Sequence, residues 1–309
     1  MNNQHPILAV CLNPTLQITI RFTEVLEGEV NRAYAHRLDA SGKGMNLARV
    51  VRQLGGDVRL LSHLGDQRKE EFLQMAKEDG VPILWTDSKS PIRTCITVLA
   101  DKGNSTTELV LESERVGAHT EATIRELFSK ELASHPVVVF SGTRTPGYSD
   151  NLYPKMVQQA KEAGCYVILD YRGRDLVESI PHSPDVIKPN LTEFWHTFFP
   201  NETPLAEGDD NNHLKELVKE KIIQLYEKFS ISTIITRGLH PLWAYHDGAF
   251  IEREVKNVRA INTIGCGDAF TAGFAFAVAK EESFEIALET GLDAASRNAQ
   301  VFRPGSLFD

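Results

Sequence analysis

The sequence predicts an α/β protein, with a three-layer α/β/α core around a mainly parallel sheet and a small β-sheet beside it. Short apolar runs rich in β-branched residues alternate along the chain with amphipathic stretches of helical period. Two other stretches have strand-like alternation with no helix between them. Strand followed by helix is the pattern of parallel strands joined by right-handed crossovers. The 309 residues are long enough for one large α/β core or for two domains. We expect a single domain over residues 1–309.

The expected elements of the core follow from these runs in order. Most of the apolar runs are too continuous to leave one strand face in water, so helices should cover both faces of the sheet. Strands are expected at residues 7–12, 58–61, 137–140, 166–169, 186–187 and 231–236. Helices are expected at residues 45–54, 70–79, 121–132, 150–163 and 213–229, followed by an apolar helix at 269–279.

Two excursions interrupt this alternation, at residues 16–38 and 91–111. The second has the pattern of a hairpin about a polar turn at 101–104. Both would pair into one small sheet, a lid built from about residues 14–40 and 91–112 at the rim of a ligand site. The alternative is two unrelated surface hairpins. The acidic stretch at 200–212, which contains Gly and Pro, is expected to be a surface loop.

Charge and composition exclude several classes of function. The chain has 33 Lys and Arg against 42 Asp and Glu, a net charge of −9 that would repel nucleic acid and anionic lipid. We therefore expect no nucleic-acid partner and no membrane partner. The four cysteines form no CxxC pair, which argues against a zinc site or a disulfide framework. The start of the chain lacks a signal-peptide pattern, and no apolar segment approaches the roughly 18 residues of a membrane span, so a cytoplasmic location is expected.

Polar residues collect directly after the predicted strands. Ligands of open parallel sheets lie beyond the carboxyl ends of the strands, so these residues together predict a polar cleft. Each segment alone would equally fit a strand-terminating turn, and Asp170 in particular is expected to cap the turn after it rather than order the water shell of a metal. The segments are Asn13-Pro14, Ser141-Gly142-Thr143, Asp170, Lys188-Pro189-Asn190 with Glu193, and Thr236-Arg237-Gly238.

The segment Gly265-Cys266-Gly267-Asp268 precedes the apolar helix. Its glycines leave backbone N–H groups at a helix N-terminus uncovered, which predicts an anion pocket. A carboxylate in the first helical turn would repel that anion unless it acts as a general base beside a bound phosphoryl group. The alternative is that Asp268 only stabilises the helix N-terminus and the glycines only form a turn.

A second segment, Gly42-Lys43-Gly44-Met45-Asn46, opens another helix and sets a cation between glycines. Such a lysine can reach a phosphate that the backbone also approaches, although a solvated side chain near a helix start is the alternative. Neither GxxxxGK[ST] nor GxGxxG occurs in the chain. A P-loop NTPase and a dinucleotide-binding dehydrogenase therefore lack their signatures.

At these two segments the chain resembles the PfkB (ribokinase-like) carbohydrate kinase family, and the resemblance extends over nearly the whole sequence. It is closest to the family's sugar-phosphate kinases, 1-phosphofructokinase and tagatose-6-phosphate kinase. Members have an α/β core with a β lid and use ATP and Mg²⁺. The motifs that carry the resemblance occur in the family's order: Asn13-Pro14, Gly28-Glu29-Val30-Asn31-Arg32, Ser41-Gly42-Lys43-Gly44-Met45-Asn46, Arg93, Thr107-Glu108, Ser141-Gly142-Thr143 with Pro146-Gly147, Lys188-Pro189-Asn190 with Glu193, and Gly265-Cys266-Gly267-Asp268.

The resemblance implies a role for each matching residue. Asp268 would take the proton of the sugar hydroxyl, and the amides of Gly265, Cys266 and Gly267 would form the hole for the phosphoryl group. Residues implied to bind the acceptor sugar phosphate are Asn13, Gln17, Gly42, Lys43, Asn46, Arg93 and Ser141. Residues implied to bind Mg-ATP are Lys188, Asn190, Glu193, Thr236, Gly238 and Asn298, with Asn190 and Glu193 reaching the metal through water.

Three positions depart from the family pattern. Gln17 stands where the family usually has an Asp that contacts sugar hydroxyls, so it offers a donor and an acceptor but no charge. Cys266 replaces a small alanine, and a thiol at a helix N-terminus can have a lowered pKa, so we expect it to react with alkylating reagents. Asn262 replaces an Asp that binds a monovalent cation in several relatives, and no potassium site is assigned.

The resemblance implies ATP-dependent phosphorylation of a sugar-phosphate hydroxyl, with fructose 1-phosphate converted to fructose 1,6-bisphosphate as the leading hypothesis. A dianionic acceptor beside ATP needs at least two cations, which Lys43 and Arg93 supply. Alternatives are a kinase for tagatose 6-phosphate, fructose 6-phosphate or an unphosphorylated sugar or nucleoside, and a catalytically silent regulator that binds sugar or nucleotide. Relatives pair through lid edges, which implies a homodimer through the lid.

Overall fold

A computed structural model describes residues 4–206 and 211–309 of the chain. Within this part, a nine-stranded sheet has the strand order β13-β12-β11-β10-β9-β8-β1-β4-β5. The strands from β11 to β5 in this order run parallel, whereas β12 and β13 add an antiparallel edge. The strands are β1 Ile7–Cys11, β4 Val58–Leu64, β5 Ile83–Asp87, β8 Val137–Ser141, β9 Tyr166–Asp170, β10 Val186–Ile187, β11 Ser232–Arg237, β12 His240–His246 and β13 Ala249–Arg253.

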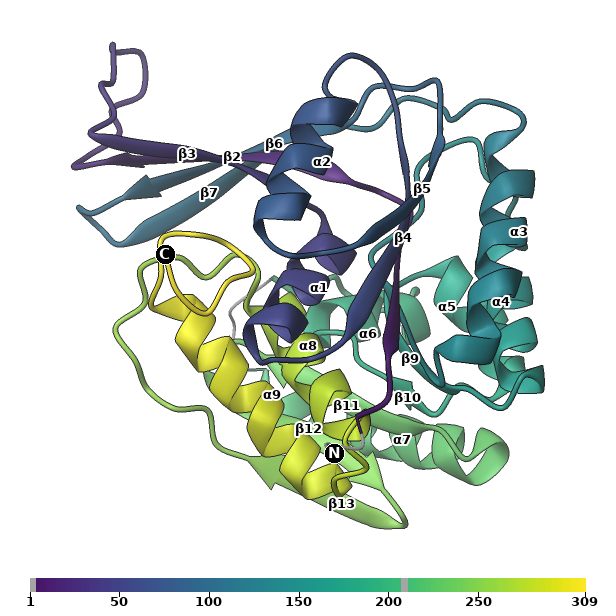
Figure 1. The fold of residues 1–309 in the computed structure, drawn as a ribbon. Coiled ribbons are helices and arrows are strands. Elements are labelled where there is room, and N and C mark those ends of the chain that lie inside the picture. Colours follow the sequence, from purple (N-terminus) through teal and green to yellow (C-terminus); the bar gives the residue numbers. More distant parts are fainter. Residues whose placement is uncertain (1–3, 207–210) are drawn as a thin grey trace.

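Helices cover both faces of this sheet, as the continuous apolar runs predict (Figure 1). The central strand β1 shows why, because Ile7 and Ala9 enter one core cluster while Leu8 and Val10 enter the other. Helices α1 (Lys43–Gln53), α2 (Lys69–Glu78), α8 (Cys266–Val278) and α9 (Phe284–Ala299) pack on the first face. Helices α3 (Thr120–Glu131), α4 (Leu152–Glu162), α5 (Arg174–Ser179), α6 (Leu191–Phe198) and α7 (Lys215–Phe229) pack on the second.

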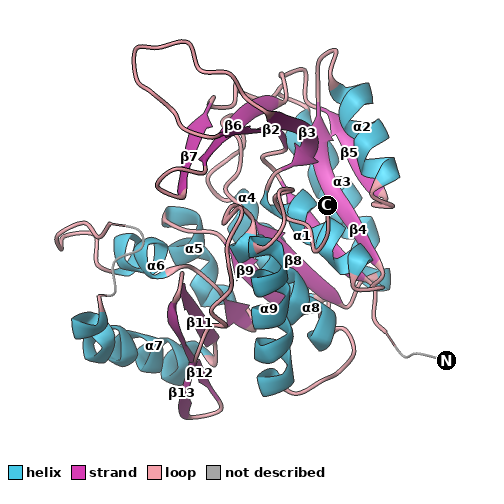
Figure 2. Ribbon diagram, turned by 90° about the vertical axis from the view of Figure 1, so that its left-hand side faces the viewer, coloured by secondary structure: helices cyan, strands magenta, loops and turns pink. Residues whose placement is uncertain are grey.

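A second sheet of four strands has the order β3-β2-β6-β7 and projects beyond the core (Figures 1 and 2). Its strands are β2 Thr15–Phe22, β3 Ala35–Ser41, β6 Arg93–Ala100 and β7 Ser105–Val110. Strand β2 pairs in parallel with β6, with Thr15 opposite Arg93, so the two excursions of the sequence meet in one sheet. The alternative of two unrelated hairpins is therefore wrong.

The three-layer α/β/α class and the separate small sheet are confirmed. The expected strands and helices agree with the structure to within a few residues, while β5, β12, β13, α5, α6 and α9 had no predicted counterpart. The β12–β13 hairpin turns at Asp247 and Gly248, which both have positive φ, as a two-residue type I′ turn requires. From the expected loop at 200–212, residues 200–206 form no helix or strand, and 207–210 lie outside the described residues.

No helix in the described part of the chain is both long and apolar enough to cross a bilayer.

Candidate active site

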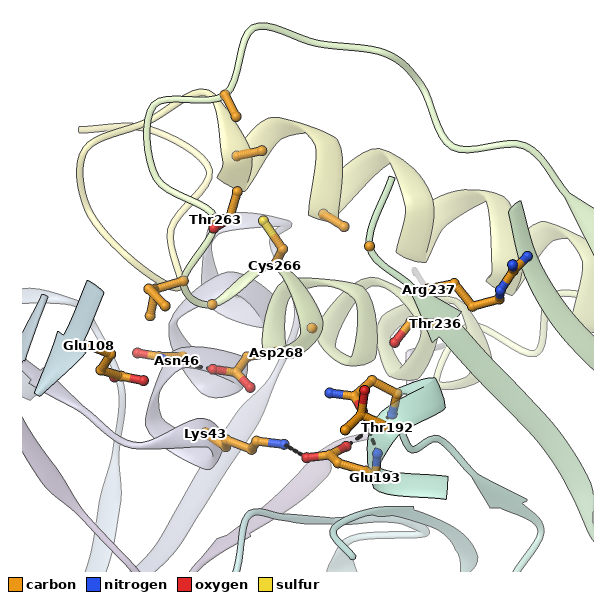
Figure 3. Close-up of a pocket in the computed structure, with 18 of the residues that line it drawn as sticks. Lys43, Asn46, Glu108, Thr192, Glu193, Thr236, Arg237, Thr263, Cys266 and Asp268 are labelled. Atoms are coloured by element: carbon orange, nitrogen blue, oxygen red, sulfur yellow. Dashed lines mark hydrogen bonds and ion pairs between the residues drawn. The ribbon is translucent and has the colours of Figure 1, made fainter. Parts of the chain in front are cut away.

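A pocket of about 560 Å³ lies at the carboxyl edge of the large sheet, beneath the small sheet. Its walls include the first turns of α1, α6 and α8, strands β2, β6 and β7, the end of β11, the segment 255–264 and α9. Figure 3 shows part of this lining. The sequence predicted a polar cleft at this edge, because the segments that follow parallel strands converge there. Predicted site residues that line it are Gln17, Gly42, Lys43, Asn46, Arg93, Lys188, Asn190, Glu193, Thr236, Gly238, Gly265, Cys266, Gly267 and Asp268.

The glycine segment that begins α8 has the geometry of an anion site. Gly265 is the N-cap residue, with φ +85°, a conformation that an L side chain rarely adopts. A Cβ at this position would also overlap the backbone nitrogen of Gly305. At Gly267 the nearest atom to an added Cβ is Lys188 Nζ at 3.8 Å, so the helix start is open on the pocket side. The Cys266 amide already donates to the Thr263 carbonyl at 3.3 Å, so the open part of this helix start is at Gly267, which carries no side chain.

Asp268 lies in the first turn of α8 and is only 6% exposed. Its Oδ2 accepts a hydrogen bond of 2.8 Å from Asn46 Nδ2 on α1, and Figure 3 shows the two side chains pointing toward each other. Burial raises the pKa of Asp268 to about 7, although Lys43 and the Asn46 hydrogen bond oppose the rise. A carboxylate that exchanges its proton near neutral pH suits general base catalysis better than helix capping.

Lys43 lies between carboxylates from two other elements. Its Nζ is 3.2 Å from Glu193 Oε1 on α6 and 3.4 Å from Asp170 Oδ1 at the end of β9. Burial would lower the pKa of Lys43, but the Coulombic attraction of Asp170 and Glu193 outweighs it and raises the pKa. Lys43 therefore carries a fixed positive charge at the pocket wall.

Asp170 does not cap the turn after β9, and that expectation is wrong. Its fully buried carboxylate accepts a hydrogen bond of 2.7 Å from Thr271 and lies 3.5 Å from Lys188 Nζ as well as close to Lys43. Burial raises the pKa of Asp170, but Lys188 and Lys43 lower it more, so the net direction is down. Asp170 thus orients two lysines of the pocket from behind, a role that no local sequence pattern reveals.

Asn190 and Glu193 are joined by a capping box at the start of α6. Asn190 Oδ1 accepts from the Glu193 amide at 2.7 Å, and Glu193 Oε2 accepts from the Asn190 amide at 3.0 Å. Asn190 is the N-cap residue and Glu193 is the third residue of the helix, the two positions that a capping box requires. Because one Glu193 oxygen is held by the cap, the other faces Lys43 in a fixed direction.

Three predicted residues lie outside the pocket lining. Asn13 Oδ1 accepts from Ser113 and Thr145 hydroxyls at 2.7 and 3.3 Å, and Ser141 is 1% exposed at the end of β8. Asn298 on α9 lies behind the glycine turn, where its Nδ2 donates to the Ile264 carbonyl at 3.0 Å and to Cys266 Sγ at 3.3 Å. These side chains shape the walls from behind.

The expectation of a lowered thiol pKa at Cys266 is wrong. Burial raises the pKa of this thiol to about 11, and the nearby Asp268 carboxylate adds to the rise, while the Asn298 hydrogen bond only partly offsets it. The helix N-terminus is therefore not sufficient to generate a thiolate here. The other cysteines, Cys11, Cys95 and Cys165, are buried, as their apolar surroundings predict.

Arg237 lines the pocket within the predicted cleft segment Thr236-Arg237-Gly238, but its contact with Trp243 was not predicted. Its guanidinium lies 3.8 Å from the centre of the Trp243 ring, which holds it against the strand-end wall. This contact depends on the β11–β12 pairing, which was not predicted. Glu108 on β7 also enters the pocket, opposite Asn46 (Figure 3).

The sequence of residues 9–307 matches the family model described as "pfkB family carbohydrate kinase". Among solved structures, phosphofructokinase-2 from Escherichia coli in complex with fructose-6-phosphate matches with 18% identity and a TM-score of 0.82, over 96% of this chain and 94% of that one. A possible 1-phosphofructokinase from Thermotoga maritima matches with 19% identity and a TM-score of 0.84, over 96% and 92%. The tetrameric inhibited form of phosphofructokinase-2 from Escherichia coli matches with 19% identity and a TM-score of 0.81, over 96% and 94%.

Proposed function

The chain belongs to the pfkB family of carbohydrate kinases, and from this premise we propose that it phosphorylates a hydroxyl of a ketohexose phosphate with ATP, converting fructose 1-phosphate to fructose 1,6-bisphosphate. The observation that carries the proposal is the position of Asp268, a buried carboxylate with a pKa of about 7 beside a glycine-rich helix start. A sugar kinase needs a base close to the groups that stabilise the transferring phosphoryl group.

Asp268 accepts the proton of the sugar hydroxyl as the hydroxyl oxygen forms its bond to the γ-phosphorus. The bond between that phosphorus and the bridging oxygen breaks, and ADP leaves with its electron pair. The amides at Gly265, Cys266 and Gly267 donate hydrogen bonds to the oxygens of the phosphoryl group in transfer. Electrostatic stabilisation of this kind, together with positioning, accounts for most of the catalysis of phosphoryl transfer.

Lys43 and Arg93 are proposed to hold the phosphate of the acceptor. Lys43 belongs to α1, and Arg93 begins β6 in the small sheet, where its Nε donates to Thr15 Oγ1 at 2.8 Å. Two cations from different elements offset the repulsion between a dianionic sugar phosphate and ATP. The small sheet also contributes Gln17 and Glu108 to the pocket, so we assign it the role of a lid over the acceptor.

The nucleotide is proposed to lie along the α6 and β11 side, with Lys188, Thr236 and Gly238 near its phosphates. The donor set fits Mg²⁺ held through water, because Glu193 and Asn190 present oxygen atoms at the pocket wall that also accept hydrogen bonds within the capping box and from Lys43. The described residues contain no group of three or more His, Cys, Asp or Glu side chains suited to a metal. In phosphoryl-transfer sites Mg²⁺ keeps several waters and is bound largely by substrate phosphates. When bound, Mg²⁺ neutralises charge on the nucleotide phosphates.

A second candidate is a kinase for a neutral sugar or nucleoside. Two observations favour it. Lys43 is already paired with Glu193 and Asp170, and Gln17, whose Nε2 donates to Thr97 Oγ1 at 2.9 Å, brings no charge to the acceptor side. A neutral acceptor would need less free positive charge than a sugar phosphate.

ADP release measured with a panel of acceptors separates these candidates. The panel is fructose 1-phosphate, tagatose 6-phosphate, fructose 6-phosphate and ribose, each with Mg-ATP. We expect the highest kcat/KM with fructose 1-phosphate, and a loss of roughly 10²–10⁴ in kcat for Asp268→Asn. Preference for ribose would select the second candidate. The absence of acceptor-dependent ADP release across the whole panel would instead support the silent regulator. An Asp268→Asn variant with a near-normal rate would remove Asp268 as the base.

A further inference from the structure

Arg49 on α1 is fully buried and lies one helical turn after Asn46. Its Nη1 donates to Asn46 Oδ1 at 3.0 Å, and its Nε donates to Asp79 Oδ2 at 2.8 Å. Nη1 is also within hydrogen-bond distance of the Pro304 and Gly305 carbonyls, at 3.3 and 3.2 Å, and Nη2 donates to the Ala40 carbonyl. The proposed reaction gives this arginine no part, yet burying a charged guanidinium is costly unless its hydrogen bonds are satisfied.

The hydrogen bonds to Asn46 fix the direction of its amide. Asn46 Oδ1 accepts from Arg49 Nη1 and also from Ser41 Oγ, each at 3.0 Å. Nδ2 therefore faces Asp268, to which it donates at 2.8 Å. A flipped amide would set Nδ2 against the guanidinium and Oδ1 against the carboxylate, so both contacts would become repulsive.

Arg49 is itself anchored by the C-terminal segment of residues 303–306. Arg303 contacts Asp39 at 2.8 Å and Asp79 at 2.7 Å, which places the segment across the end of β3 and the end of α2. Gly305 lies directly against Asn46, because a Cβ there would overlap the Asn46 side chain. The same glycine blocks a Cβ at Gly265, so this segment is wedged between Asn46 and the start of α8.

We propose that Arg49 is a positioning residue for the active-site carboxylate: through Asn46 it fixes which amide atom meets Asp268. Its relevance to catalysis rests on the proposed function, whereas the relay from Arg49 to Asn46 to Asp268 stands on the hydrogen bonds alone. The other charged groups that act on Asp268 are Lys43, Asp170 and Lys188, and none of them contacts Arg49 in the described residues.

Replacing Arg49 with Met removes one of the two donors to Asn46 Oδ1 and frees the amide to rotate. Asp268 then loses part of a hydrogen bond that favours its charged form, so its apparent pKa should rise by about half a unit to one unit. If Asp268 is the base, kcat below pH 7 should fall about three- to tenfold, since each pKa unit is a factor of ten in the ionised fraction.

The matched control is Arg303→Met, which removes a neighbouring arginine from the same charge network without touching Asn46. If the only effect of Arg49→Met were to weaken this charge network, the Asp268 pKa would change to the same extent in both variants. The second comparison repeats Arg49→Met in an Asn46→Ala background, where a residue that acts through Asn46 has no further effect on Asp268.

The titration of Asp268 is measured by NMR of protein labelled at the aspartate side-chain carboxyl carbons, without substrates, and its signal is assigned by its absence in Asp268→Asn. We expect a raised pKa in Arg49→Met, a clearly smaller change or none in Arg303→Met, and no added change in the Asn46→Ala background. An unchanged pKa in Arg49→Met, an equal rise in Arg303→Met, or an added rise in the Asn46→Ala background would overturn the proposal.

If Arg49→Met does not fold, Ser41→Ala removes the other donor to Asn46 Oδ1 and should raise the Asp268 pKa by a smaller amount. An unchanged titration in that variant would then overturn the relay. Because the titration needs no turnover, its outcome is separate from the proposed function: a failed acceptor panel leaves the relay intact, and a failed relay leaves the kinase activity intact.

Discussion

Asp268 shows a conflict between activity and stability in a single side chain. Its carboxylate is almost fully buried, and its pKa is raised from an ordinary 3.8 to about 7. Folding therefore favours the protonated form. Stability that is fully present below pH 3.8 is lost progressively as pH rises toward 7, where the folded protein also ionises.

Asp268→Asn should accordingly be more stable than the parent protein above pH 7. The pKa change corresponds to a gain of up to about 4 kcal/mol in the free energy of unfolding. Urea unfolding at several pH values between 5 and 8 measures it, and the difference should grow with pH and level off above about 7. A difference that stayed constant over this range would contradict the raised pKa.

The two proposed phosphate-binding cations, Lys43 and Arg93, lead to a prediction about the KM for the acceptor. Arg93→Met removes a charge from the small sheet, and Lys43→Met removes one from α1. Each should raise the acceptor KM by about 10- to 150-fold, the equivalent of about 1.5–3 kcal/mol for a charge-assisted hydrogen bond.

Steady-state kinetics with fructose 1-phosphate, and with ATP varied separately, measure this effect. The KM for ATP serves as the internal control and should stay near its parent value in Arg93→Met, because Arg93 lies on the acceptor side. A variant pair with unchanged acceptor KM would favour the neutral-sugar candidate.

The placement of residues that follows from the local sequence was predictable, whereas contacts between distant segments were not. Glycines around Lys43 and before Asp268 mark helix starts open to an anion, and that signal lies within a few residues. Asp170 acts through Lys43 and Lys188, from other elements. The thiol of Cys266 is set by burial and by Asn298 on α9.

At the scale of elements, the start of α8 depends on a glycine that cannot be exchanged. Gly265→Ala meets two penalties: a positive φ and an overlap with the backbone of Gly305. The matched control is Gly164→Ala, at φ +79° with nothing within 4 Å of an added Cβ. It should lose only about 1–2 kcal/mol of stability, the strain of the left-handed conformation.

Gly265→Ala should lose more stability than the control, by about another 1–3 kcal/mol of steric overlap. It should also lose roughly 10²–10³ in kcat, because displaced amides no longer meet the phosphoryl group. Chemical denaturation and ADP release measure the two effects. Equal stability loss in both variants, with normal turnover in Gly265→Ala, would show that the turn tolerates a side chain.

The elements that the sequence predicted are those with an unbroken pattern. The β1, β8 and β9 runs are continuous and apolar because helices cover both their faces, and β2 meets β6 because both alternate. Strands β12 and β13 were not predicted, because the polar residues His240, His246 and Glu252 interrupt the apolar pattern of these strands at the edge of the sheet. The Asp247-Gly248 turn was the signal that could have revealed them.

At the scale of the whole molecule, one face of the small sheet carries apolar side chains that are partly or largely exposed. Gln17, Arg93 and Cys95 line the pocket from one side of this sheet. Successive side chains of a strand point to opposite faces, so Ile18, Ile96 and Leu109 lie on the other face of the sheet. Ile18 on β2 is opposite Ile96 on β6, and Ile96 is opposite Leu109 on β7. Ile18 and Ile96 are partly exposed, and Leu109 is largely exposed. An exposed apolar face of this kind suits contact with a second copy of the chain, and we propose that the homodimer forms through this face.

Leu109→Glu should weaken that dimer, because it places a charge on the apolar face at a side chain that is already 52% exposed, with little strain on the monomer. The matched control is Leu217→Glu, on α7 and 42% exposed, far from the small sheet in sequence and in the fold (Figure 1). Light scattering after size exclusion, over a range of protein concentrations, gives the mass of each variant. We expect a dimer for the parent and for Leu217→Glu, and a monomer for Leu109→Glu. A monomeric parent, or a Leu109→Glu variant that stays dimeric, would place the contact elsewhere.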